Sequence, residues 1–251
     1  MTGHLSVIGL GPGTSDQVTP EASRHLAAAE QLFGYGPYLD RLTLVASQRR
    51  VASDNREELG RADAALTAAA AGARVAIVSG GDPGVFAMAA AVCEAVEHGP
   101  EEWRTVDISI VPGITAMLAV AARIGAPLGH DFCAISLSDN LKPWETVLTR
   151  LRAAASAGFV IALYNPVSRA RPWQLDAALD LLRAELPPET PIVFGRAAGR
   201  ADERLAVIRL DEARGDMADM ATCLIIGTAE TRIVVRPGLP ALVYAPRGAS
   251  R

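Results

Sequence analysis

The sequence has few cysteines, a single lysine and no long hydrophobic run. Cys93, Cys133 and Cys223 are odd in number and widely separated, which is typical of free thiols in a reducing cytoplasm and excludes a disulfide scaffold. No apolar stretch reaches the roughly 20 residues that a membrane span needs. The first residues have no basic segment before their apolar stretch, so they predict a first strand and not a signal peptide.

Metal ligands and excess positive charge are also missing. The four histidines show no ligand spacing, so we expect no metal site. The net charge of −4 argues against nucleic acid as the main partner, because phosphate binding favours a basic surface. Lys142 is the only lysine, and every other basic residue is an arginine. This shortage has two explanations, a compositional bias of the source genome or a specific role for Lys142.

The most informative stretch is residues 75–86, VAIVSGGDPGVF. Its four apolar residues without polar alternation predict a strand buried on both faces. Gly80 and Gly81 allow a tight exit and leave the backbone bare, while Asp82 and Pro83 predict the start of a helix. Open α/β sheets bind ligands where a strand, a turn and a helix N-terminus meet in this way. A turn that simply needs its glycines explains the pattern equally well.

The first half of the chain alternates between predicted strands and helices. Residues 5–10 predict a strand, and the loop after it lacks the last glycine of a dinucleotide-binding motif, which is Thr14. Pro12 also removes a backbone donor from this loop, so no phosphate cradle is expected. Thr19 and Pro20 predict a helix to about Phe33. Further helices are predicted from residue 53 or 54 to 71, from 83 to about 99 and from 115 to 124, with a strand at 106–111.

The second half is predicted to form another α/β domain. Strands are expected at residues 132–137, 159–163, 192–195, 205–209 and 222–226, and helices from about 146 to 156 and from about 174 to 186. Residues 233–251 have a mixed pattern, and their end is expected to be a loose tail. We therefore expect two α/β domains, residues 1–113 with a largely parallel sheet and residues 114–251 with a mixed sheet.

Four segments together carry a family resemblance: GLGPG at 9–13, SGGDP at 79–83, VPGITA at 111–116 and YNP at 164–166. In this order and spacing the chain resembles the tetrapyrrole methyltransferases, which use S-adenosylmethionine, over about residues 5–226. Residues 34–38, 53–58, 138–144 and 164–169 are most similar to the members that methylate C17 of precorrin-3B and contract its ring in cobalamin synthesis. Those members tend to carry an asparagine after Arg196, where this chain has Ala197.

The resemblance implies that S-adenosylmethionine lies folded in the cleft between the two domains. Such a cofactor has no phosphate, and it requires backbone polar groups and apolar walls. Position-matching gives the cofactor-binding residues as Leu10, Gly80, Gly81, Asp82, Val85, Phe86, Thr115, Ala116, Asn165 and Ala198. Helix capping alone would also explain Asp82 and Thr115.

The implied substrate is a macrocycle with many carboxylates, which an acidic protein must meet with local positive charge. The candidates in loops are Arg56, Lys142, Arg169, Arg171, Arg196 and Arg200. Arg61, Arg74, Arg150 and Arg183 fall within predicted elements and are expected to be solvated. Four aromatic residues either stack on the macrocycle or serve as packing anchors within the protein: Tyr35, Tyr38, Trp144 and Trp173.

Ring contraction needs a proton donor or acceptor near a substrate hydroxyl, and the candidates are Asp139, Lys142, Ser138 and Ser168. Cys93 and Cys133 are expected in the core and not as nucleophiles. By resemblance we expect a homodimer, and the free thiols predict a cytoplasmic protein. Three alternatives stay open: a methyltransferase acting at another ring carbon, a relative acting on ribosomal RNA or protein, and a non-catalytic tetrapyrrole-binding module.

Overall fold

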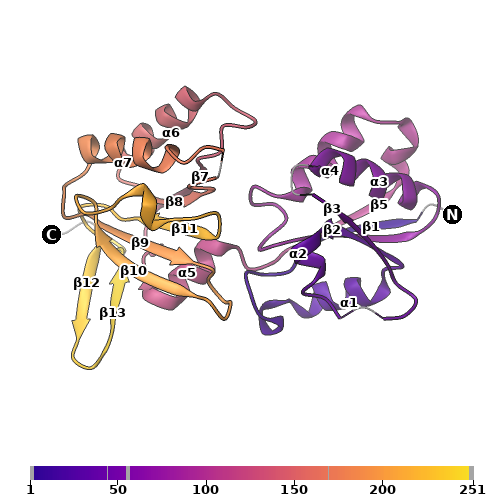
Figure 1. Cartoon of the computed structure of the whole chain (residues 1–251), viewed down its shortest axis with the longest axis horizontal. Helices are drawn as coiled ribbons and strands as arrows, with labels where there is room; N and C mark the ends of the chain where they lie inside the picture. Colours follow the sequence, from indigo (N-terminus) through magenta and orange to yellow (C-terminus); the bar gives the residue numbers. More distant parts are fainter. Residues whose placement is uncertain (1–2, 44, 55–56, 169, 249–251) are drawn as a thin grey trace. The chain divides into compact units, whose positions relative to one another are not determined.

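The computed structural model describes residues 3–43, 45–54, 57–168 and 170–248 (Figure 1). The chain divides into two compact units, Met1–Thr115 and Ala116–Arg251. The predicted domain boundary, after residue 113, lies two residues before this division. The assignment of residues 1–113 and 114–251 to two domains stays a prediction.

The first unit is built on a five-stranded sheet in the order β3-β2-β4-β1-β5. All of its strand pairs are parallel, as the predicted alternation of strands and helices required. Its strands are β1 (His4–Gly9), β2 (Gln31–Tyr35), β3 (Arg49–Ser53), β4 (Arg74–Ser79) and β5 (Asp107–Val111). The four residues 75–78 of the central strand β4 are at most 1% exposed, which confirms the predicted buried strand.

Helices cover both faces of this sheet (Figure 1). They are α1 (Pro20–Ala28), α2 (Gly36–Leu39), α3 (Glu58–Ala70) and α4 (Met88–His98), with short 3₁₀ turns at Ser15–Gln17 and Glu101–Thr105. Ile8 and Leu32 belong to the core beneath α1 and α2, and Val7 and Leu66 to the core beneath α3 and α4. The predicted cap at Thr19 is confirmed, because its hydroxyl oxygen accepts a hydrogen bond from the Ala22 amide at 3.0 Å.

Two strands of the first unit were not predicted. Helix α1 ends at Ala28 and not near Phe33, and β2 and β3 follow it. The short apolar run at residues 31–35 cannot be assigned to helix or strand by periodicity alone. The chain leaves the helix where the Glu30 amide donates to the Arg74 carbonyl at 2.7 Å and the Arg49 amide donates to the Glu30 carbonyl at 2.8 Å. Sheet pairing therefore overrides the local helix pattern.

The second unit holds a mixed sheet, as predicted, and its five strands lie in the order β10-β9-β11-β8-β7. The pair of β7 (Phe132–Ser136) and β8 (Val160–Tyr164) is parallel, whereas β9 (Pro191–Arg196), β10 (Arg204–Arg209) and β11 (Thr222–Ile226) pair in antiparallel fashion. Helices α6 (Trp144–Ser156) and α7 (Gln174–Glu185) cover one face, and α5 (Ala116–Ile124) packs on β11 from the other (Figure 1). A 3₁₀ turn lies at Gly215–Met217.

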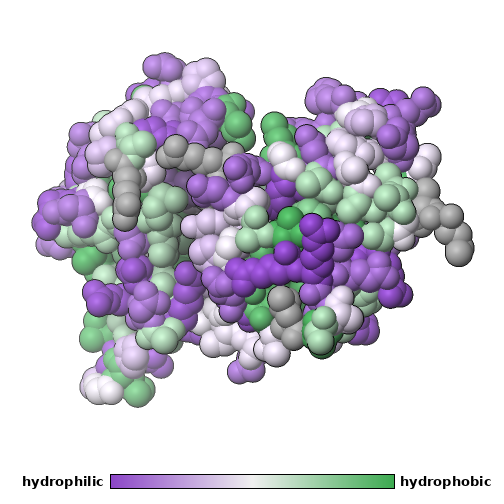
Figure 2. Space-filling view, turned by 45° about the vertical axis from the view of Figure 1, so that its right-hand side comes forward, coloured by the Kyte–Doolittle hydropathy of each residue, from purple (hydrophilic) through white to green (hydrophobic). Residues whose placement is uncertain are grey.

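The last stretch, for which the mixed pattern predicted no element, forms a hairpin, and the predicted loose end falls partly outside the described residues. Strands β12 (Arg232–Arg236) and β13 (Leu239–Tyr244) pair with each other, and β13 also pairs with the short β6 (Gly125–Ala126). The hairpin exposes apolar side chains, with Val235 81% and Leu239 61% accessible (Figure 2). No helix among the described residues has the length and apolar character needed to cross a membrane.

Two glycines that flank Tyr35 give a matched test of the packing. A Cβ on Gly34 would lie 2.6 Å from Cγ2 of the buried Val78, whereas a Cβ on Gly36 would meet nothing within 4 Å. We expect Gly34→Ala to lower the free energy of unfolding by about 1–3 kcal/mol and Gly36→Ala to change it by less than about 0.5 kcal/mol. Urea titration followed by circular dichroism measures both, and equal losses would contradict this packing.

Candidate functional site

Three loops meet at the carboxyl ends of strands β1, β4 and β5. The Gly11 amide donates to the Gly81 carbonyl at 3.1 Å, and the Gly81 amide donates to the Gly11 carbonyl at 3.0 Å. The Leu10 amide also donates to the Ser79 carbonyl at 2.9 Å. The loops after β1 and β4 are therefore joined through their main chains at the edge where parallel sheets bind ligands.

Glycine is required at this junction because backbones pass close to one another. A Cβ on Gly113 would lie 2.2 Å from the Gly81 carbonyl oxygen, and a Cβ on Gly9 would lie 2.6 Å from the same atom. Gly11 and Gly81 have φ angles of 64° and 69°, which favour glycine. A Cβ on Gly80 would lie 2.8 Å from the Tyr38 ring. The absence of side chains at these glycines is therefore required for the loops to pack together. Room for a ligand to approach the main chain would be a second consequence of the same glycines.

Asp82 does not cap a helix, and the prediction that a helix begins at Pro83 is wrong. One carboxylate oxygen of Asp82 accepts from the Gly84 amide at 2.8 Å, and the other accepts from the Gly113 amide at 3.0 Å. Asp82 therefore joins the loop after β4 to the loop after β5. The chain then bends through Phe86, and α4 begins at Met88.

The remaining predicted cofactor residues of the first unit differ in exposure. Phe86 is 49% exposed and Val85 half-buried, so both offer apolar surface. Thr115 is 5% exposed, and Leu10 is fully buried in the core beneath α1. Ala116 is the first residue of α5. The cofactor contacts of these residues stay predictions.

In the second unit, the predicted cofactor residues also follow strand ends. Strands β8 and β9 are both antiparallel to β11, so their carboxyl ends share one edge of the sheet. Asn165 follows β8, and its side-chain amide donates to the hydroxyl of the buried Ser136 at 3.0 Å. Ala198 follows β9 and is 6% exposed.

Strained backbone is concentrated in these loops. Among the described residues, the non-glycine positions with positive φ are Phe86, Asn165 and Ala197, at 52°, 52° and 49°. Asparagine tolerates this conformation better than most residues, whereas phenylalanine and alanine rarely adopt it. Such conformations persist where the surrounding structure imposes them, and they cluster at ligand sites.

Asp139, a predicted acid or base, fastens two loops of the second unit together. One of its carboxylate oxygens accepts from the Arg171 guanidinium and, at 2.8 Å, from the side-chain amide of Gln174, which is 2% exposed. The rings of Trp144 and Trp173 meet edge to face beside the same loops, with centroids 5.0 Å apart. These contacts give Asp139 a structural role, and its part in catalysis stays a prediction.

The predicted cations have different surroundings. Burial lowers the pKa of the half-buried Lys142, and the nearby Arg150 charge adds to this effect. Arg196 pairs with Asp202 at 2.6 Å and with Asp219 at 2.7 Å, and the bond to Asp202 is the main cause of the raised pKa of Arg196. Arg200 is exposed, and its main-chain amide donates to the Ala197 carbonyl at 2.9 Å. Arg56 and Arg169 lie outside the described residues.

Of the predicted hydroxyls, Ser168 has a buried oxygen without a hydrogen-bond partner among the described residues. Its main chain pairs with that of Arg171, since each amide donates to the other's carbonyl. Ser138 donates its amide to the Ser136 hydroxyl at 3.3 Å. The unpartnered oxygen of Ser168, in the loop after β8, is free to bond a water molecule or a substrate group.

The thiols were only partly placed correctly. Cys93 is exposed on α4, so its prediction as a core residue is wrong: it lies on the outward face of the helix with Ala90 and Glu94, which are also exposed. Burial raises the pKa of the half-buried Cys133 thiol and raises that of the buried Cys223 to about 12. Thiolate chemistry is therefore disfavoured at Cys133 and Cys223.

Two arginines near the ligand edge were missed. Arg61 was expected to be solvated, but it is 5% exposed and lies among the buried residues of α3. Its spacing of four residues from the buried Ala65, repeated at Ala69, is the signal that places it on the inner face. Arg41 donates to three carbonyls of the loop after β1. Its position after α2 gives no sequence signal for this role.

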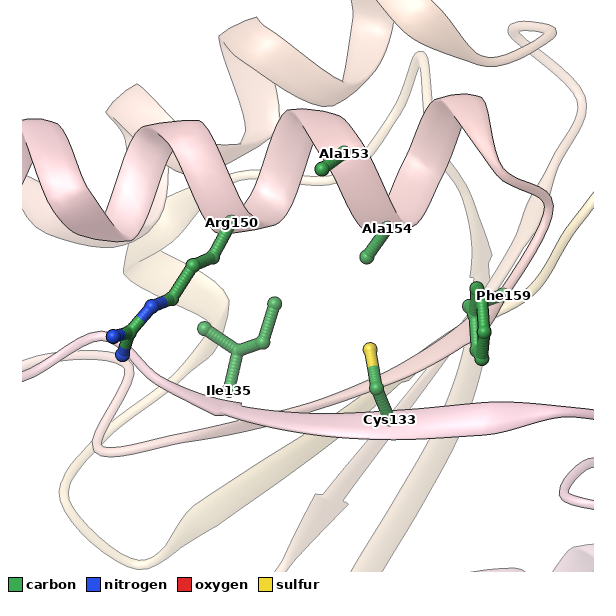
Figure 3. Close-up of a pocket in the computed structure, with 6 residues that line it drawn as sticks. All are labelled: Cys133, Ile135, Arg150, Ala153, Ala154 and Phe159. Carbon is green, nitrogen blue, oxygen red and sulfur yellow. The ribbon is translucent and has the colours of Figure 1, made fainter.

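A separate apolar cavity of about 350 Å³ lies between α6 and β7 (Figure 3). The side chains of Cys133 and Ile135 point from the strand toward Ala154 on the helix, and Phe159 closes one end. The guanidinium of Arg150 points away from it (Figure 3). No predicted site residue lines this cavity, and the absence of converging polar groups in its lining makes it unsuitable for a zwitterionic cofactor.

Comparison with known proteins identifies the family. The model of the Tetrapyrrole (Corrin/Porphyrin) Methylases matches residues 4–214. The chain belongs to the tetrapyrrole methylase family. Among curated relatives, the precorrin-3B C(17)-methyltransferase of a Sinorhizobium species is 68% identical over 98% of this chain and 97% of its own length.

Solved structures agree with this family assignment. The crystal structure of the methyltransferase CobJ is 50% identical, has a TM-score of 0.93 and covers 98% of this chain and 100% of its own. The uroporphyrin-III C-methyltransferase of Thermus thermophilus, complexed with S-adenosylhomocysteine, is 25% identical with a TM-score of 0.68. It covers 90% of this chain and 97% of its own.

The residues of the tetrapyrrole methylase fold fit the cofactor of the family, S-adenosylmethionine. Main chain of the half-exposed residues 80–82 offers polar groups, and Phe86 and Val85 offer apolar surface. Pro12 leaves the loop after β1 without a phosphate cradle, which this cofactor does not need. Among the described residues, no three His, Cys, Asp or Glu side chains form a metal-binding group. The placement of the cofactor between the two domains stays a prediction.

The contact between Asp139 and Arg171 can be separated from a catalytic role by a double-mutant cycle. We expect Asp139→Ala and Arg171→Ala to destabilise the protein non-additively, with a coupling of about 0.5–3 kcal/mol. The exposed pair of Arg209 and Asp211 is the matched control, with a coupling below about 1 kcal/mol. Loss of turnover in Asp139→Ala with wild-type stability and no coupling would instead support an acid or base role.

Proposed function

We propose that this chain transfers a methyl group from S-adenosylmethionine to C17 of precorrin-3B, with ring contraction to precorrin-4, in cobalamin biosynthesis. The observation that carries this proposal is the 68% identity, over 98% of the chain, to a protein named for that reaction. The likeness to the crystal structure of the methyltransferase CobJ, with a TM-score of 0.93 at 50% identity, also supports it.

We propose that each unit contributes cofactor contacts through its strand-end loops. In the first unit these are Gly80, Gly81, Asp82, Val85 and Phe86, together with Leu10 and Thr115. In the second unit they are Ala116, Asn165 and Ala198. The left-handed backbone at Phe86 and Asn165 supports this assignment, because strain of this kind marks ligand loops.

When bound, S-adenosylmethionine supplies an activated methyl group to an electron-rich carbon. The protein then has to hold the two reactants in line and exclude water, which by itself supplies much of the rate. Rigid loops suit this task, and Asp82 and the paired glycines provide that rigidity. For ring contraction, Ser168, Lys142 and Asp139 are the proposed groups that hold or move a proton.

The substrate carboxylates require cations. Lys142 is the best placed of the described candidates, because it is half-buried in a loop and none of the ion pairs among the described residues involves it. Arg200 is a second proposed contact of the substrate carboxylates. Arg196 is less suited to this role, because it is already paired with two carboxylates of the protein. Arg56 and Arg169 keep this role as proposals from the resemblance.

We further propose a cytoplasmic homodimer that binds neither nucleic acid nor membrane. The acidic net charge of −4 disfavours nucleic acid. The apolar side chains exposed on the β12–β13 hairpin offer surface for a second copy. A second candidate function, methylation of a different ring carbon, shares the fold and the cofactor.

Single-turnover mass spectrometry of the protein with precorrin-3B and ¹³C-methyl S-adenosylmethionine tests the proposal. We expect the tetrapyrrole to gain one labelled methyl group, which carbon NMR locates at C17, together with a shifted absorption spectrum. Label at another carbon would favour the second candidate, and return of an unchanged tetrapyrrole would indicate a binding module.

Lys142 gives a pH-dependent test. We expect Lys142→Ala to raise the KM for the tetrapyrrole about tenfold or more, since a charge-assisted hydrogen bond is lost, with little change in cofactor affinity. Because the pKa of Lys142 is lowered, this side chain loses its positive charge at a lower pH than an ordinary lysine does. The affinity of the wild-type protein for the tetrapyrrole should therefore fall as the pH rises through that lowered pKa. Lys142→Arg should keep its affinity there. If Lys142→Ala had the kinetics of the wild-type protein, Lys142 would have no specific role, and compositional bias would explain why it is the only lysine.

A further inference from the structure

The loop between β9 and β10, residues 197–203, is buried where it leaves the sheet. Ala197 is 4% exposed and Ala198 is 6% exposed. Ala197 and Gly199 both have left-handed backbone, with φ angles of 49° and 80°. Left-handed backbone at a residue other than glycine costs free energy, so the surrounding contacts must hold this loop in place.

The main chain of Ala198 has polar groups without a partner in the described part of the protein. Its amide and its carbonyl take part in none of the hydrogen bonds among the described residues. Buried main-chain groups are almost always bonded, whether to protein, to water or to a ligand. An amide and a carbonyl left open at a buried position therefore support the proposed contact of Ala198 with the methyl donor.

Glu203, the last residue before β10, binds this loop from its far end. Its carboxylate accepts from the Gly199 amide, next to Ala198, and its own amide donates to the Arg200 carbonyl at 3.1 Å. A hydrogen bond from a main-chain amide to a carboxylate is charge-assisted and roughly twice as strong as one between neutral groups. Glu203 thus fixes the main chain on the C-terminal side of Ala198.

The carboxylate of Glu203 is held in turn by Arg123 of α5. The Arg123 Nε donates to both carboxylate oxygens at 3.2 Å, and the Glu203 side chain is 24% exposed. Helix α5 is a firm support, because it packs so closely on β9 that a Cβ on Gly195 would lie 2.2 Å from Cγ2 of Val120. A continuous set of contacts therefore runs from α5 through Arg123 and Glu203 to the loop.

Glu203 reaches the proposed cofactor loop without being one of the proposed cofactor contacts. We propose that Glu203 is a positioning residue for the methyl donor: it holds the Gly199 amide and thereby presents the main chain of Ala198. Arg123 supports this role by orienting the carboxylate of Glu203. This inference rests on the proposed function, since the contact of Ala198 with S-adenosylmethionine is part of that proposal.

Calorimetry with S-adenosylhomocysteine tests the role of Glu203. Glu203→Ala removes the acceptor of the Gly199 amide, and we expect it to weaken S-adenosylhomocysteine about tenfold, equivalent to about 1.4 kcal/mol. Glu203→Gln keeps an acceptor oxygen at this position, so it should recover most of that loss. In turnover assays, Glu203→Ala should raise the KM for S-adenosylmethionine about tenfold and leave kcat at saturating substrates unchanged.

The pair of Arg152 and Glu185 is the matched control. The Arg152 Nε lies 3.2 Å from Oε1 of Glu185, whose side chain is also 24% exposed, and the pair joins α6 to the end of α7. Glu185→Ala should leave both constants unchanged, although it removes an ion pair of the same geometry. Arg123→Ala keeps the carboxylate of Glu203 and removes its support. It serves should Glu203→Ala fold poorly, and it should shift the same constants by a smaller factor.

Wild-type affinity in Glu203→Ala, or an equal loss in Glu203→Ala and Glu185→Ala, would overturn the positioning role. A lower kcat with an unchanged KM would also overturn it. Failure of the proposed function has a different signature: the wild-type protein would bind S-adenosylhomocysteine without methylating precorrin-3B at C17, and the calorimetric comparison would still decide the role of Glu203. A wild-type protein that does not bind S-adenosylhomocysteine would overturn both.

Discussion

The reciprocal hydrogen bonds between Gly11 and Gly81 are the constraint on which the first unit's ligand edge depends. They bring two loops so close that the neighbouring Gly9 and Gly113 have no room for a Cβ. With side chains excluded, the chemistry of this edge is left to main-chain groups and to the few residues that surround them. Asp82 extends the same junction to a third loop through the Gly113 amide.

The loops at this edge are fixed by side chains that bond to main chain. Arg41 binds three carbonyls, Arg61 binds the end of β3 and Asp82 binds two amides. In the second unit, the bonds of Asn165 to Ser136 and of Asp139 to Arg171 hold loops in the same way. Loops without regular structure must satisfy their polar groups by such bonds, and the result is a preorganised edge suited to a reaction that depends on alignment.

Local sequence signals predicted the elements whose boundaries are marked by capping residues, glycine or proline. Examples are the β-branched run of β4, the Thr19–Pro20 cap and the carboxyl-terminal ends of α3 and α4. Strands β2 and β3 were missed, because the short apolar run of β2 and the polar segment of β3 form strands only through pairing with other segments. The hairpin of β12 and β13 was missed for the same reason, since β13 also pairs with β6.

The site divides in a similar way. The glycine loops could be located from the sequence, because glycine pairs and proline mark strand exits. The role of Asp82 could not, since helix capping and loop bonding share one sequence signature. Helical spacing does reveal Arg61, whereas the acceptors of Arg41 are carbonyls far away in sequence.

The most direct test of this account is amide hydrogen exchange at Gly11 and Gly81, measured by NMR with and without S-adenosylhomocysteine. If their reciprocal bonds form the rigid platform for the methyl donor, both amides exchange as slowly as the neighbouring core strands, and the ligand slows them further. Exchange at the rate of an open loop, or protection that the ligand leaves unchanged, would contradict it.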